Sequence, residues 1–97
     1  MAELNQIYCK ETNIVSREIV GEMILVPIRQ NIGDLESIYT LNETAARTWE
    51  LIDGQNTLSD INTRITNEYQ VSQETALSDL LALIDQLEEA GAVIKVA

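Results

Sequence analysis

The sequence contains no histidine and no phenylalanine, and it has only one cysteine among its 97 residues. Without histidine, the chain lacks the most common general base and the most common transition-metal ligand. A single cysteine, Cys9, cannot form an intramolecular disulfide or build a zinc site by itself. The sequence also has no glycine-rich phosphate-binding loop. We therefore expect no catalytic residue, no metal site and no cofactor, and the chain is not predicted to be an enzyme.

Basic residues are scarce as well: 6 lysines and arginines stand against 16 acidic residues, which gives a net charge of −10. Residues 72–90 contain acidic side chains and no basic one. Proteins that dock on a duplex need lysine and arginine for phosphates and base edges. Nucleic acid is therefore excluded as a partner.

The longest uncharged apolar run extends only from Met23 to Ile28. This run is much too short for a signal sequence or a membrane span. We expect a cytoplasmic protein that does not associate with a membrane.

The first half of the sequence is typical of strands. Two runs rich in β-branched residues, residues 14–20 and 23–28, flank Gly21-Glu22 and predict a hairpin. Ser37 to Leu41 alternates polar and apolar residues and predicts a third strand. Residues 1–13 are either a tail or a short docking segment that packs back on the body, and residues 14–97 form the domain.

The second half of the sequence carries helix signals. Asn42, Thr57 and Ser72 are each suited to cap a helix, and Asp60 can complete a capping box with Thr57. The longest helix is expected over residues 73–90, and residues 92–96 form a last strand or an extended tail. The predicted fold class is α+β and winged helix-turn-helix-like, with a three-stranded antiparallel sheet followed by three helices.

The apolar residues of the longest predicted helix spread over about half of its circumference, which is wider than a one-sided surface helix requires. One interpretation is that this helix is the centre of the core. The other is that one shoulder lines an open groove, with the third strand as an edge that accepts an extended peptide by strand addition. This shoulder comprises Ala76, Leu80, Leu83 and Leu87.

Four segments resemble the PqqD family. They are the run from Ser16 to Glu22, the block from Leu41 to Gly54, the run from Thr57 to Ile61 and the closing segment from Leu80 to Ile94. The block that holds the only tryptophan and ends in Asp-Gly is the most specific of them. The loop over residues 30–36 departs from the short glycine-containing turn expected before the third strand.

The resemblance implies a small non-catalytic chaperone that recognises a ribosomally made precursor peptide. Its leader peptide would add as a strand to the third strand and the last helix and be presented to a modifying enzyme, such as a radical S-adenosylmethionine protein or a cyclase. The resemblance does not select between the pyrroloquinoline quinone, lasso or another peptide pathway. The implied contacts are Ser37, Ile38, Tyr39, Thr40 and Leu41 together with Ala76, Leu80, Leu83 and Leu87.

A second hypothesis remains open. The same leucines could dock a structural winged-helix subunit on a partner protein or on a second copy. A monomer or a weak dimer is expected under the leader-peptide hypothesis, whereas a tight dimer that covers the shoulder would favour this alternative.

Overall fold

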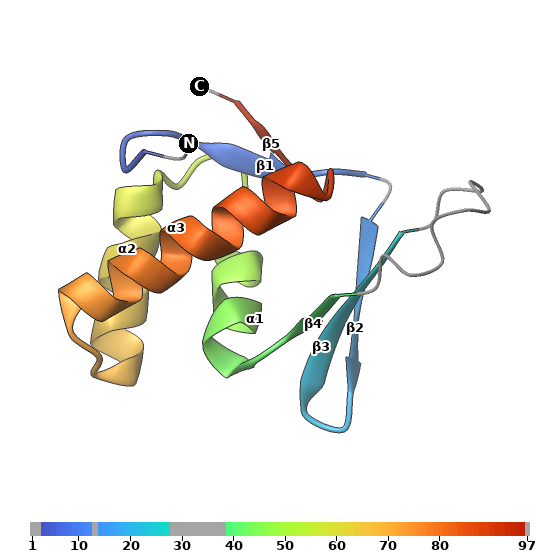
Figure 1. Cartoon of the computed structure of the whole chain (residues 1–97), viewed down its shortest axis with the longest axis horizontal. Helices are drawn as coiled ribbons and strands as arrows, with labels where there is room; N and C mark the ends of the chain where they lie inside the picture. Colours follow the sequence, from blue (N-terminus) through green and yellow to red (C-terminus); the bar gives the residue numbers. More distant parts are fainter. Residues whose placement is uncertain (1–2, 13, 28–38, 97) are drawn as a thin grey trace.

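The structure is a computed structural model that describes residues 3–12, 14–27 and 39–96. Over these residues the chain forms two small antiparallel sheets and a cluster of helices (Figure 1). The predicted α+β fold, with a three-stranded sheet followed by three helices, is confirmed. In chain order the elements are β1 (Tyr8–Lys10), β2 (Ile14–Ile19), β3 (Glu22–Pro27), β4 (Tyr39–Leu41), α1 (Glu43–Leu51), α2 (Leu58–Tyr69), α3 (Gln73–Glu89) and β5 (Val93–Lys95).

The predicted hairpin is present as β2 and β3, which pair from Ile14 opposite Pro27 to Ile19 opposite Glu22. Its turn is Val20-Gly21, one residue earlier than the sequence pattern indicates. Both turn residues have positive φ, 50° for Val20 and 81° for Gly21. Two-residue hairpin turns of this kind need positive φ at both positions because their twist then matches that of the strands.

The third strand of this sheet is β4, and it lies at an edge because the strand order is β2-β3-β4. It pairs with β3 alone, with Leu41 opposite Met23 and Tyr39 opposite Leu25. The predicted strand begins at Ser37, but residues 37 and 38 lie outside the described residues. No other described strand pairs with the outer side of β4, so this edge offers free backbone groups.

The described part of the N-terminal segment packs against the rest of the domain. In β1, Tyr8 is opposite Lys95 of β5 and is only 2% exposed. The ammonium of Lys10 lies 5.4 Å from the ring centroid of Trp49, a cation–π contact that joins β1 to α1. The C-terminal segment is therefore a strand and not an extended tail.

All three predicted helix caps form. The side-chain oxygen of Asn42 accepts from the Ala45 N–H at 2.9 Å, and Thr57 and Asp60 make the reciprocal capping box. Ser72 caps α3, which ends at Glu89, one residue before the predicted end.

The core lies where the helices meet one another and the two sheets. It is aliphatic apart from Tyr8 and Trp49, as a chain without phenylalanine requires. Its most deeply buried members, at most 3% exposed, are Tyr8, Leu25, Trp49, Ile52, Leu58, Ile61, Ile84, Leu87, Ala92 and Val93.

The loop from α1 to α2 is closed by Asp53. Its carboxylate accepts the backbone N–H groups of Gln55 at 2.9 Å and Asn56 at 2.8 Å. The Asn56 amide in turn donates to the carbonyl of Leu51 at 3.1 Å, which satisfies an orphan group at the end of α1. These hydrogen bonds, Asn56 first, hold the pKa of Asp53 below its ordinary value.

This loop predicts an acid-sensitive contribution to stability. Because the folded pKa of Asp53 is depressed, the contribution is present above the ordinary carboxyl pKa of about 4 and is lost as the pH falls through the folded value. The D53N variant should therefore lose less free energy of unfolding than the wild type between about pH 6 and about pH 3. Urea unfolding at several pH values measures this. E89Q, at an exposed position that ends α3, is the matched control, and parallel curves for wild type and D53N would contradict the assignment.

Candidate functional site

An open hollow of about 350 Å³ lies between the start of α1 and the face of α3. It begins where β4 ends, because Asn42 directly follows Leu41 and is one of its lining residues. One wall comes from the first turns of α1, and Ile65 of α2 and Val71 close the far end. The lining residues are Asn42, Thr44, Ala45, Thr48, Ile65, Val71, Thr75, Ala76, Asp79, Leu80, Ala82, Leu83 and Gln86.

The face of α3 contributes two neighbouring rows, each spaced by three or four residues so that its members lie on one side of the helix. In the inner row, Ala76 is 5% exposed, Leu80 is 4% exposed and Leu83 is half-buried. All members of the outer row are exposed. The hollow therefore has an apolar floor and a more polar rim. The outer row comprises Thr75, Asp79, Ala82 and Gln86.

Several polar groups in the lining already have partners within the chain. The Asn42 side chain is occupied by the helix cap, and the Thr48 hydroxyl donates to the carbonyl of Thr44 at 2.9 Å. The Thr75 hydroxyl accepts from Ser72 at 2.9 Å. These groups stabilise the walls. By contrast, the Asp79 carboxylate makes no side-chain hydrogen bond or ion pair with another described residue.

The α1 wall is held against α2 by an ion-pair cluster. The Arg47 guanidinium makes two bonds with the Glu68 carboxylate, at 2.8 and 3.0 Å, and a third with Glu50 at 3.1 Å. Arg64 also approaches Glu68, at 3.5 Å. Hydrogen bonding to Glu68, and then to Glu50, raises the pKa of Arg47, and the Arg47 bonds lower the pKa of Glu68. The cluster is in partial contact with solvent, since the Arg47 side chain is half-buried and Glu50 and Arg64 are exposed. Its role is therefore to orient the helices more than to stabilise them.

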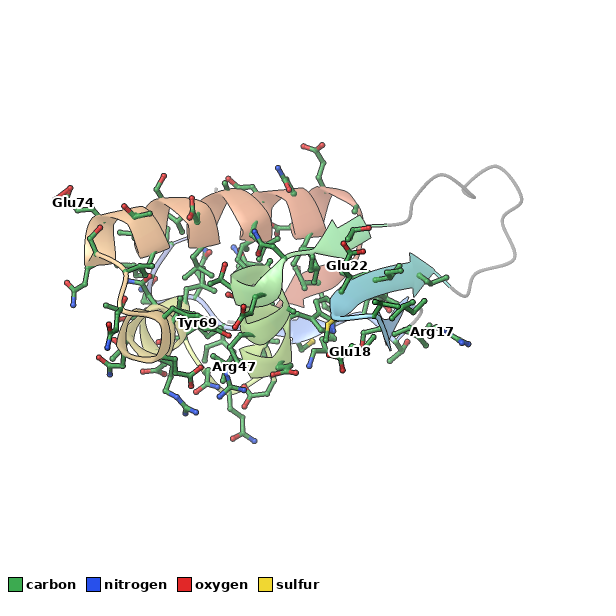
Figure 2. The ribbon with its side chains drawn as sticks, turned by 90° about the horizontal axis from the view of Figure 1, so that it is seen from below. Arg17, Glu18, Glu22, Arg47, Tyr69 and Glu74 are labelled. Atoms are coloured by element: carbon green, nitrogen blue, oxygen red, sulfur yellow. The ribbon has the colours of Figure 1, made fainter. Side chains whose placement is uncertain are left out.

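Figure 2 shows α3 on the opposite side of β4 from β2 and β3, with its ribbon running along the same line as β4. Figure 1 agrees, since β4 descends toward α1 while α3 rises in the opposite direction. The outer edge of β4 is therefore on the side of α3, and the hollow begins at Asn42, directly after this strand. Thr40 at the centre of β4 is exposed, and Leu41 is 4% exposed.

The residues predicted to bind a peptide are only partly brought together. Ala76, Leu80 and Leu83 line the hollow. Leu87 needs correction: it is 1% exposed, does not line the hollow and belongs to the core. Its spacing from Leu83 puts Leu87 in the same row of α3 as the residues that line the hollow. The chain beyond Glu89, however, turns back into β5, which contacts α3. Tyr39, Thr40 and Leu41 form β4, while Ser37 and Ile38 lie outside the described residues.

Sequence reasoning missed the outer row of α3 and the α1 wall. The outer row could have been found from the inner row. Asp79 and Ala82 each precede an inner-row residue by one position, so the two rows run side by side along the helix. The α1 wall, with Ala45 and Thr48, has no comparable signal in the sequence. It depends on how α1 packs across α3, which is tertiary information.

Over residues 3–12, 14–27 and 39–96, no group of three or more potential metal ligands comes together. None of the helices in these segments has the length and apolar content that a membrane crossing requires.

The sequence profile of the family described as Coenzyme PQQ synthesis protein D (PqqD) matches residues 22–93. Two solved structures are similar, both with a TM-score of 0.73. TbiB1 in complex with the TbiA(beta) leader peptide is 21% identical and covers 92% of this chain and 98% of that one. Lasso peptide synthetase B1 complexed with the leader peptide is 24% identical and covers 90% of this chain and 96% of that one. At this identity the two structures establish a shared fold. A comparison with curated proteins found no match.

Proposed function

The chain belongs to the PqqD family, and from that membership we propose that it binds the leader of a ribosomally made precursor peptide and presents it to a modifying enzyme. It catalyses no reaction itself. Two proteins of the same fold are complexed with leader peptides, which supports this function. The modifying enzyme would be a radical S-adenosylmethionine protein or a cyclase, and the cytoplasm, where precursor peptides are made, would be the site of action.

One observation carries the proposal: the edge strand β4, whose outer side pairs with no described strand, leads directly into Asn42, where the hollow beside α3 begins. An extended peptide added to this edge gains main-chain hydrogen bonds from β4. Its side chains alternate between two faces, so every second one is directed at α3. The edge supplies affinity that is independent of sequence, and the hollow supplies the selection.

The proposed contacts follow from this arrangement. Backbone contacts come from Tyr39, Thr40 and Leu41 of β4, and Ser37 and Ile38 are proposed as further contacts of the same peptide. Side-chain contacts come from Ala76, Leu80 and Leu83. Leu87 supports the floor from within the core and does not touch the peptide.

A binding titration tests the function. Short open reading frames that neighbour the gene would supply candidate precursor peptides. Fluorescein-labelled leader and core halves of each candidate would be titrated with the protein while fluorescence anisotropy is recorded. The leader half should bind saturably and the core half should not, because only the leader carries the recognition segment. Equal binding of both halves, or of neither, would contradict the proposal. Sedimentation over a concentration series then shows whether a tight dimer covers the hollow instead.

A further inference from the structure

We propose that Asp79 is the residue that selects the leader peptide by charge, and that it pairs with a lysine or arginine of the bound segment. This inference rests on the proposed function and deepens it by naming the chemical class of the peptide. The evidence lies in the outer row of α3, because a peptide strand added to β4 would contact this row where it crosses the hollow.

Among the described residues that line the hollow, Asp79 has the only ionisable side chain. It is exposed at the rim, directly beside the buried Leu80 and one turn from Ala76 and Leu83. A bound peptide would cover this rim and remove water from the carboxylate. A carboxylate that loses water without gaining a partner costs free energy, so the peptide is expected to supply a cation.

The described part of the chain offers no cation there. Of the basic residues that the structure describes, none lines the hollow. Arg47 and Arg64 are engaged by Glu68, and Lys10 lies over Trp49. The remaining two described basic residues are on strands, Arg17 on β2 and Lys95 on β5.

The surrounding field has the same sign. All charged residues of α3 are acidic, and the whole chain carries −10. A field of this kind attracts cationic peptides and repels acidic ones before contact. Asp79 is the one acidic side chain of α3 that lines the hollow. It therefore favours a basic residue at one position of the peptide, whereas the surrounding field favours cationic peptides in general.

Spacing defines that position further. Asp79 and Leu83 are four residues apart on α3, about 6 Å along the helix axis. Two residues of an extended strand span about 6.6 Å, and their side chains point to the same face. Because β4 and α3 run along similar lines (Figures 1 and 2), a strand on β4 lies along α3. A peptide with a basic residue two positions from an apolar one can therefore place the basic side chain at Asp79 and the apolar side chain against Leu83.

The test is selection of random linear peptides displayed on phage, carried out in parallel on wild type, D79K and E89K. Both variants make the same charge change at exposed positions of α3, but position 89 lies outside the hollow. Wild type and E89K should enrich peptides with lysine or arginine two positions from an apolar residue. D79K should enrich aspartate or glutamate at that place instead.

Synthetic versions of the selected peptides then quantify the effect. A wild-type-selected peptide should bind D79K about tenfold more weakly and should regain affinity when its basic residue is changed to glutamate. Higher salt should reduce the difference between wild type and D79N.

Selected peptides that lose binding to L83D, yet show no basic preference or bind D79K as tightly as wild type, would overturn the role of Asp79 and leave the proposed function intact. Failure to select any peptide that is sensitive to L83D would contradict the proposed function, and the role of Asp79 would fall with it.

Discussion

Replacing Leu83 by aspartate should weaken binding of the leader peptide by at least about 30-fold, or about 2 kcal/mol, while the domain stays folded. Leu83 is half-buried and forms part of the apolar floor. In the complex, the new carboxylate would lose water against apolar side chains without gaining a hydrogen-bond partner. It would also repel the carboxylate of Asp79 one turn away.

The matched control for this variant is L81D. Leu81 is also half-buried on α3 and packs against the core, but it does not line the hollow. L81D should lose stability to a similar degree and change leader affinity by less than about twofold, because position 81 does not line the hollow. If either aspartate variant fails to fold, L83A and L81A provide the same comparison with a smaller effect. Equal loss of binding in both members of a pair would contradict the assignment of Leu83 to the hollow.

Replacing Ile84 by alanine should lower the free energy of unfolding by about 2–5 kcal/mol. Ile84 is 0% exposed and lies one position from Leu83, on the side of α3 that faces the core. Removing its outer atoms leaves a cavity that the surrounding helices fill only partly. The loss is a large share of the 5–15 kcal/mol that is usual for a domain.

Urea unfolding measures this effect, with L83A as the comparison. Since Leu83 is only half-buried, its truncation should cost clearly less stability than that of Ile84. In the folded fraction, I84A should still bind the leader, whereas L83A should bind it less tightly. A loss for I84A no greater than that for L83A would show that the core is not centred on this side of α3.

I84A and L83A also answer a question that the sequence leaves open: whether the wide apolar face of the longest helix belongs to the core or lines a groove. The structure divides this face. Ile84 and Leu87 are in the core, whereas Leu83 is at the hollow, and Ala76 and Leu80 both line the hollow and pack within the core. A helical wheel cannot make this division because it depends on which neighbours cover each side. Leu87 lies in the part of the core that β5 closes. The sequence does not reveal this contact, so the prediction that Leu87 binds the peptide is wrong.

Local signals could be predicted well. Asn42, Thr57 with Asp60, and Ser72 were each expected as helix caps, and each forms, because a cap depends on residues only a few positions apart. The turn at Val20-Gly21 was displaced by one residue, since a β-branched residue at positive φ is uncommon and the pattern favours the following pair.

Long-range pairing was harder to predict. The pairing of β1 with β5 joins the two ends of the chain, and nothing near Tyr8 indicates Lys95 as its partner. The α1 wall of the hollow was missed for the same reason. In contrast, the edge position of β4, which the groove interpretation requires, is present in the structure, since β4 is the last strand in the order β2-β3-β4.

The most direct test of the central claim, that the leader adds as a strand to β4 beside α3, is a map of backbone amide shifts. The protein, labelled with ¹⁵N, would be titrated with the unlabelled leader half of the precursor peptide. We expect the largest changes at residues 37–41, at the first turn of α1 and along residues 75–86 of α3. Changes confined to the hairpin tip at Val20-Gly21, or to the β1–β5 sheet on the other side of the domain, would contradict the account.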